Sequence, residues 1–115
     1  MSAQTPENVF DRQVALSRVG GDTQLLREIA ELFIKECPRA FAAIQEAVEN
    51  GDAAKLESAA HALKGSVANF GAKDAVEAAF RLEQMGRSKK MSEAVDTLHA
   101  LESALSVVCA ELATA

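Results

Sequence analysis

Aromatic side chains are scarce in this chain of 115 residues, which has five Phe and neither Trp nor Tyr. Proline and glycine are also few, with two and six residues respectively. Strands favour β-branched and aromatic residues, whereas Ala, Leu, Glu, Gln and Lys favour helices. The composition therefore argues against an all-β fold and predicts a helical protein.

Excess positive charge and long apolar runs are absent as well. The formal net charge is −5, and nucleic-acid binding depends largely on Lys and Arg at phosphates, so we expect no nucleic-acid partner. No apolar run approaches the ~18 residues of a membrane span, so we expect no membrane insertion. Residues 1–8 are polar and lack a basic segment followed by an apolar one. This pattern predicts no signal peptide and a cytoplasmic location.

Residues that bind metals or form disulfides are few. Cys37 and Cys109 each lie in an apolar helical pattern, which predicts reduced thiols that act as small hydrophobic residues. Together with His61 and His99 they lie on three expected helices, without the spacing of metal ligands. We therefore expect no metal site, and we expect His99 to be an ordinary surface residue.

The periodicity of apolar residues predicts five helices in one domain, residues 1–115, with its bundle core at about residues 22–112. The first expected helix covers about residues 11–19 and the fourth about residues 73–85, while the second, third and last begin at the expected caps Asp22, Asp52 and Ser92. Short connections between four long amphipathic helices favour an all-α fold, an antiparallel up-and-down four-helix bundle with a short extra N-terminal helix. The length is sufficient to bury a core without a metal or disulfide.

Helix boundaries follow from capping residues and breakers. Asp22, Asp52 and Ser92 are expected N-caps, because their side chains accept hydrogen bonds from the first turn. Pro38 is expected to kink or break the second helix. Residues 86–90 are expected to form a polar loop. The expected inward residues are Leu25, Ile29, Leu32, Phe33, Cys37, Phe41, Ile44, Val48, Leu56, Ala60, Leu63, Val67, Phe70, Val76, Ala79, Phe80, Met91, Val95, Leu98, Leu101, Leu105, Val108 and Leu112.

His61 lies on the outer side of the third helix. At ~100° per residue it is about 140° from the centre of the apolar stripe, so its ring is expected to face solvent. Gly65 follows one turn later on the same side, where a glycine costs about 1 kcal/mol relative to alanine. Lys64, three residues after the histidine, can reach a group attached to the ring. This combination suits an anion held on the imidazole, with Gly65 clearing space for a large partner.

Glu83 has the spacing of the apolar stripe of the fourth helix. A carboxylate at such a position needs a donor, because burying it unpaired is costly. The ring N–H of His61 is a candidate if the two helices are adjacent. That bond would select the tautomer and leave the other nitrogen free as a nucleophile. Pairing with a lysine, or simple exposure to solvent, is the alternative for this residue.

The segment His61-Ala62-Leu63-Lys64-Gly65-Ser66, followed by residues 68–72 (Ala-Asn-Phe-Gly-Ala), closely resembles the signature of histidine phosphotransfer domains of bacterial phosphorelays. Leu82-Glu83 with the later Gly86, and residues 21–33, are also similar to that family. The resemblance implies phosphorylation of His61 on its exposed nitrogen. It implies that Lys64 lies near the phosphoryl oxygens and that Gly65 leaves room for the partner.

The resemblance also implies partners and a docking surface. The expected partners are receiver domains of response regulators and of a hybrid sensor kinase, which would supply the phosphorylated aspartate and Mg²⁺. The receiver is expected to dock on the surface around His61, which includes Glu57, Ser58, Gly65, Ala68 and Arg87. No glycine-rich nucleotide loop is present, so we expect a carrier without bound cofactor and without autokinase activity. We also expect the protein to act as a monomer.

Two other functional classes remain open at this point. A histidine kinase dimerisation domain is also helical, but usually carries an acidic residue directly after its histidine, where this chain has Ala62. A stable dimer would favour that alternative. A helical adaptor that binds its partners without phosphate is the other.

Overall fold

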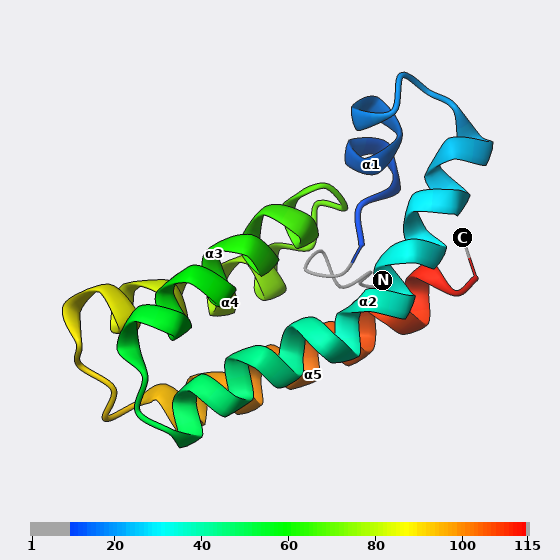
Figure 1. Cartoon of the computed structure of the whole chain (residues 1–115). Helices are drawn as coiled ribbons and strands as arrows, with labels where there is room; N and C mark the ends of the chain where they lie inside the picture. The colour runs from blue at the N-terminus through cyan, green and yellow to red at the C-terminus, as the bar shows by residue number, and fades with distance from the viewer. Residues whose placement is uncertain (1–9, 115) are drawn as a thin grey trace, which may run out of the picture.

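The computed structural model describes residues 10–114 and contains five helices (Figure 1). They are α1 (Arg12–Arg18), α2 (Thr23–Glu49), α3 (Ala53–Ala68), α4 (Lys73–Ser88) and α5 (Ala94–Leu112). Residues 1–8, on which the signal-peptide prediction rests, lie outside the described part. Within the described residues, no helix is both long and apolar enough to span a membrane.

Helices α2 to α5 form an antiparallel bundle in which each helix packs on the next and α5 returns to α2. Figure 1 shows α3 and α4 as one hairpin lying beside the pair α2 and α5. Helix α1 contacts the first part of α2, which extends beyond α3 and α4. The predicted all-α up-and-down bundle with a short extra N-terminal helix is therefore confirmed.

Aspartates begin the first three helices. Asp22 accepts a hydrogen bond from the backbone N–H of Leu25 at 3.0 Å, and Asp52 accepts one from Lys55 at 3.1 Å. Each satisfies one of the N–H groups that a helix start leaves unpaired. These two predicted caps are confirmed. Asp11 caps α1 in the same manner, accepting from Gln13 at 3.1 Å.

The connection between α4 and α5 differs from the prediction. Gly86 lies inside α4, which continues to Ser88 and ends at Lys89 in the left-handed conformation, with φ 60°. Ser92 does not cap α5, because the helix begins later and its N-cap position is Glu93, which makes no side-chain capping bond. Residues 86–90 were expected to be a loop because they are polar and include glycine, but α4 continues through Gly86, which packs on α3, to Ser88.

Pro38 does not break α2, which runs as one helix of 27 residues. Its ribbon changes direction part-way along its length in Figure 1. Proline removes one helical hydrogen bond and crowds the preceding turn. Here the ring is exposed, so it causes no conflict in the core, and the hydrogen bonds and packing of the remaining helix outweigh the local cost.

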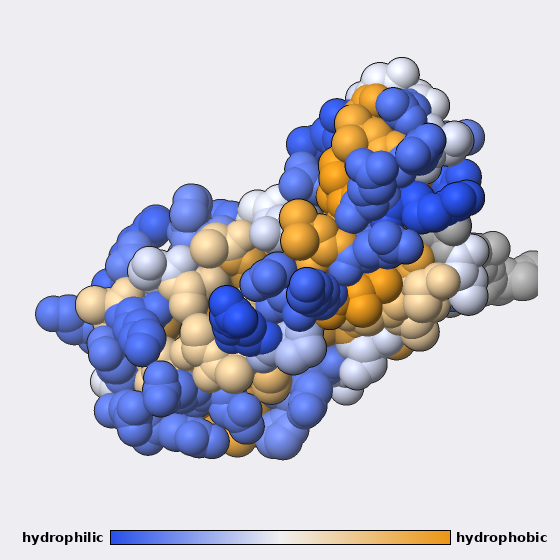
Figure 2. Space-filling view, turned by 45° about the vertical axis from the view of Figure 1, so that its right-hand side comes forward, coloured by the Kyte–Doolittle hydropathy of each residue, from blue (hydrophilic) through white to orange (hydrophobic). Residues whose placement is uncertain are grey.

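Most expected core residues are buried. They include all five predicted inward residues of the third helix, from Leu56 to Phe70. Leu25, Leu32, Phe80 and Val95 are exposed instead. On α2 the buried positions near the start are Leu26 and Ala30, because only α1 and the end of α3 cover that part of the helix. The face shown in Figure 2 has strongly apolar residues gathered where the end containing α1 joins the bundle.

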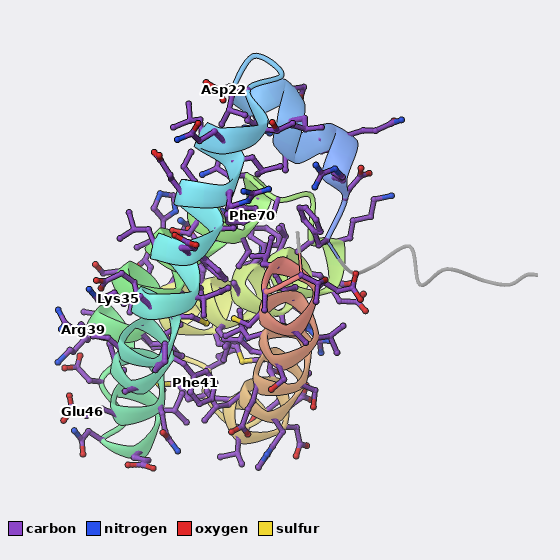
Figure 3. All side chains as sticks on the ribbon, turned by 90° about the vertical axis from the view of Figure 1, so that its right-hand side faces the viewer. Asp22, Lys35, Arg39, Phe41, Glu46 and Phe70 are labelled. Atoms are coloured by element: carbon purple, nitrogen blue, oxygen red, sulfur yellow. The ribbon has the colours of Figure 1, made fainter. Side chains whose placement is uncertain are left out.

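Phe70, directly after α3, connects the end of the molecule that contains α1 to the bundle (Figure 3). Its ring packs against Phe33 with centroids 5.2 Å apart and against Phe10 at 6.3 Å. Its carbonyl accepts a hydrogen bond from the backbone N–H of Asp11 at 2.8 Å. Lys35, Arg39 and Glu46 point away from the bundle on the outer side of α2. The aromatic contacts therefore link the residue just before α1 to α2 and to the segment that follows α3.

Gly71→Ala tests this attachment. Gly71 has φ +64°, and an added Cβ would lie 2.7 Å from Cβ of Asp11. Gly51 is the matched control, because it has φ +65° but open space around its Cβ position. We expect Gly71→Ala to reduce the free energy of unfolding by about 1–3 kcal/mol more than Gly51→Ala does, measured by urea titration. Equal losses would mean that the contact with α1 is unimportant.

Candidate functional site

His61 lies on the outer face of α3, and its side chain is 68% exposed. Its ring borders a shallow hollow between α3 and α4. The hollow is lined by Ala54, Glu57, Ser58, His61, Glu83 and Arg87. The exposure expected from the helical projection is therefore observed, and a large partner has direct access to the ring.

Glu83 of α4 is only 3% exposed, and its carboxylate holds the His61 ring. Nδ1 of His61 is 2.9 Å from Oε2 of Glu83. Lys64 places its ammonium 2.7 Å from Oε1, and Arg87 donates from Nη2 to Oε2 at 3.3 Å. The ammonium of Lys64, and next the hydrogen bond from His61, lower the pKa of Glu83 against the opposing effect of burial. The carboxylate is therefore ionised at neutral pH.

The ionised carboxylate determines which nitrogen of His61 carries the proton. An ionised carboxylate only accepts hydrogen bonds, so Nδ1 must be the protonated nitrogen that donates to Glu83. In the neutral ring Nε2 then has a free lone pair. Because the ring is largely exposed, this lone pair is available to an electrophile brought by a partner.

The ammonium of Lys64 pairs with Glu83, and its side chain is 26% exposed. At 2.7 Å the ammonium and Oε1 of Glu83 form a close ion pair. The pairing expected for Glu83 therefore involves both candidates, the histidine and a lysine.

Arg87 bridges two carboxylates at the edge of the hollow. Its Nε donates to Oε2 of Glu57 at 2.9 Å, while its Nη2 contacts Glu83. These contacts raise the pKa of Arg87, with Glu57 as the main cause. The guanidinium thus connects the first turns of α3 to the last turns of α4.

Gly86 explains how α4 comes so close to α3, and sequence reasoning missed its role. A Cβ at Gly86 would lie 2.6 Å from the carbonyl oxygen of Ala53 and 2.6 Å from the backbone nitrogen of Glu57. Glycine is therefore required where the backbones of the two helices meet. The signal in the sequence is a glycine three residues after Glu83, on the same helix face.

Gly65 has the opposite environment. Nothing lies within 4 Å of a Cβ built on it, so packing between helices of this chain does not account for this glycine. Ser58 is exposed on the same side and Ala68 is partly buried. No side chain therefore projects from the surface at Gly65, as is required if this glycine leaves room for a partner beside His61.

The four residues considered for metal binding do not converge. Among the described residues, no group of three or more His, Cys, Asp or Glu is arranged to hold a metal ion. Cys37 is buried and Cys109 is partly buried, and both are free thiols. Burial, followed by the proximity of Cys109, raises the pKa of the Cys37 thiol to about 12. Cys37 is therefore protonated at neutral pH and packs as a small apolar side chain.

Gly86→Ala and Gly65→Ala form a matched pair of helical substitutions. We expect Gly86→Ala to lower the free energy of unfolding by about 1–3 kcal/mol, because α4 must move away from α3. Gly65→Ala should raise it by about 0.5–1 kcal/mol, because alanine favours the helix and its methyl group meets open space. Urea unfolding of both variants measures the difference. An unchanged stability for Gly86→Ala would contradict the close helix contact.

The ion pairs of Glu83 also predict a pH dependence. Since the folded-state pKa of Glu83 lies below its unfolded value of about 4.3, the pairing stabilises the fold above that pH. This contribution is lost as the pH falls through the folded pKa. The stability difference between the wild type and Glu83→Gln should therefore shrink from pH 7 to pH 3 in urea titrations. A constant difference would show that the carboxylate does not titrate with the fold.

Comparison with known proteins places this geometry in a family. The family model described as "Hpt domain" matches residues 28–111. The crystal structure of histidine-containing phosphotransfer protein B (HptB) from Pseudomonas aeruginosa PAO1 has the same fold, with a TM-score of 0.86 and 21% sequence identity. The alignment covers 96% of this chain and 95% of that one. The search of curated proteins gave no match. The family match covers well over half of the sequence, and the chain therefore belongs to the Hpt family of histidine phosphotransfer domains.

Proposed function

We propose that this protein is a phosphorelay carrier that accepts a phosphoryl group on Nε2 of His61 and passes it on. The observation that carries the proposal is the bond from Nδ1 to the buried carboxylate of Glu83. In the neutral ring this bond leaves Nε2 unprotonated, and the side chain is exposed on a chain of the Hpt family. A carrier needs this arrangement, because the same nitrogen must bond to phosphorus and later release it.

The proposed reaction exchanges the phosphoryl group with an aspartate of a receiver domain. The lone pair of Nε2 attacks phosphorus, the new N–P bond forms, and the P–O bond to the aspartate breaks, releasing a carboxylate. Attack makes the ring more cationic, and the negative charge of Glu83 beside Nδ1 stabilises that change. Return transfer to a second receiver is the reverse of these steps.

Positioning and charge neutralisation carry most of the catalysis in phosphoryl transfer. In the proposed role, Lys64 supplies positive charge for the phosphoryl oxygens. Arg87, with Glu57, Ser58, Gly65 and Ala68, belongs to the surface on which the receiver docks. The receiver, of a response regulator or a hybrid sensor kinase, supplies the aspartate and Mg²⁺. The carrier itself holds no cofactor and uses no ATP.

The closed bundle supports this role over that of a kinase dimerisation domain. Helices α2 to α5 of one chain bury their apolar faces against one another, so the core is complete without a second copy. This arrangement supports a monomeric carrier. Sedimentation equilibrium tests it, since a stable dimer would favour the dimerisation domain.

Phosphotransfer from an aspartyl-phosphorylated receiver tests the proposal. The wild type should gain acid-labile label on His61, and His61→Gln should gain none while its circular dichroism spectrum stays helical. Gly65→Gln should fold normally, since its side chain meets open space within the chain, yet transfer at least tenfold more slowly because the receiver is blocked. Unlabelled wild type that still binds the receiver would instead indicate an adaptor. Normal transfer by Gly65→Gln would refute the proposal that Gly65 leaves room for the receiver.

A further inference from the structure

Phe80 is a large apolar residue whose position the core does not explain. The residue is 41% exposed, although it was expected to face inward with Val76 and Ala79. It lies three residues before Glu83 on α4, so the two side chains share one face of the helix. Exposure of a phenyl ring on that face costs free energy unless the ring contacts something there.

The ring contacts Lys64. The ammonium of Lys64 lies 4.9 Å from the centroid of the Phe80 ring and 2.7 Å from Oε1 of Glu83. This distance is in the range of a cation–π interaction, in which the negative face of the ring attracts the cation. Lys64 comes from α3, whereas both of its partners come from α4. Its ammonium is thus held between a carboxylate and an aromatic ring one helical turn apart.

The two contacts differ in what they allow the ammonium to do. The contact with Glu83 at 2.7 Å involves one carboxylate oxygen, and an ammonium has three N–H groups, so others remain available. The attraction to the ring depends little on which N–H points where. The ammonium can therefore turn from Oε1 towards a phosphoryl group on His61 while it remains over the ring. His61 contacts the other oxygen of the same carboxylate, so the ammonium and the ring are held by one group.

We propose that Phe80 is a positioning residue for phosphoryl transfer, which holds the ammonium of Lys64 beside His61 as that cation exchanges Glu83 for the phosphoryl oxygens. This inference rests on the proposed function. A lysine stem loses considerable rotamer freedom when it is ordered, and the ring provides that ordering before the partner arrives. Phe80 itself touches neither the phosphoryl group nor the reacting nitrogen in this role.

Single-turnover transfer from a phosphorylated receiver distinguishes the ring from mere bulk. Phe80→Leu keeps an apolar side chain but removes the ring, and we expect the maximal rate to fall about two- to fivefold, as for a partly exposed cation–π contact. Phe80→Tyr keeps the ring and should transfer within about twofold of the wild type. Val95→Ala, which alters another exposed apolar residue on α5, is the surface control and should transfer normally.

The Lys64→Ala background separates positioning from docking. If Phe80 acts through Lys64, Phe80→Leu should cause no further loss in Lys64→Ala, and the receiver concentration at half-maximal rate should stay unchanged. A persistent loss, or an effect only on that concentration, would overturn the proposal in favour of direct contact with the receiver. Equal rates for Phe80→Leu and the wild type would also overturn it.

A nuclear magnetic resonance measurement gives a readout that does not depend on transfer. The ring current of Phe80 should shift the ε-methylene protons of Lys64 upfield in the wild type and in Phe80→Tyr, but not in Phe80→Leu. Absence of that shift in the wild type would refute the contact itself. Absence of label on wild-type His61 would instead refute the proposed function, so the two failures are distinguishable.

Discussion

A buried, ionised carboxylate organises the outer surface of this bundle. Moving a carboxylate out of water costs several kcal/mol unless cations and donors replace the lost hydration. Glu83 is compensated by His61 and Lys64 from α3 and by Arg87 from its own helix. Removing any of these partners would leave the buried charge less well compensated. The orientation of the imidazole is therefore tied to the electrostatics that keep α3 and α4 together, and it does not depend on a loop.

The compensation works only because the two helices meet backbone to backbone. Gly86 has no side chain where α4 touches the first turn of α3, and this contact brings the carboxylate within reach of Nδ1 of His61. The same approach lets Arg87 bridge to Glu57. Packing density and site geometry are thus one constraint, since a single added methyl group at this contact would disturb both.

Two glycines near the site serve opposite purposes. Gly86 faces inward and removes an obstacle between helices, whereas Gly65 faces outward and leaves the surface beside His61 low. Before transfer, the ammonium of Lys64 already has two partners, because it pairs with Glu83 and lies over the ring of Phe80. In the proposed transfer, an arriving phosphoryl group would compete with the carboxylate for that ammonium. The negative charge of the carboxylate is then shared between Arg87 and the cationic ring, which the reaction needs to stabilise.

Local patterns in the sequence determined the helices, the capping aspartates, the inner face of α3 and the exposure of His61. Each follows from spacing along one helix or from a side chain bonding to its own backbone. Tertiary structure alone decided the partner of Lys64, the burial of Leu26 in place of Leu25, and the helical state of Gly86. These depend on which neighbouring helix covers a given face and how closely it approaches. The helical period gives the direction of each side chain around its own helix axis. It does not give the distance from that axis to the axis of a neighbouring helix.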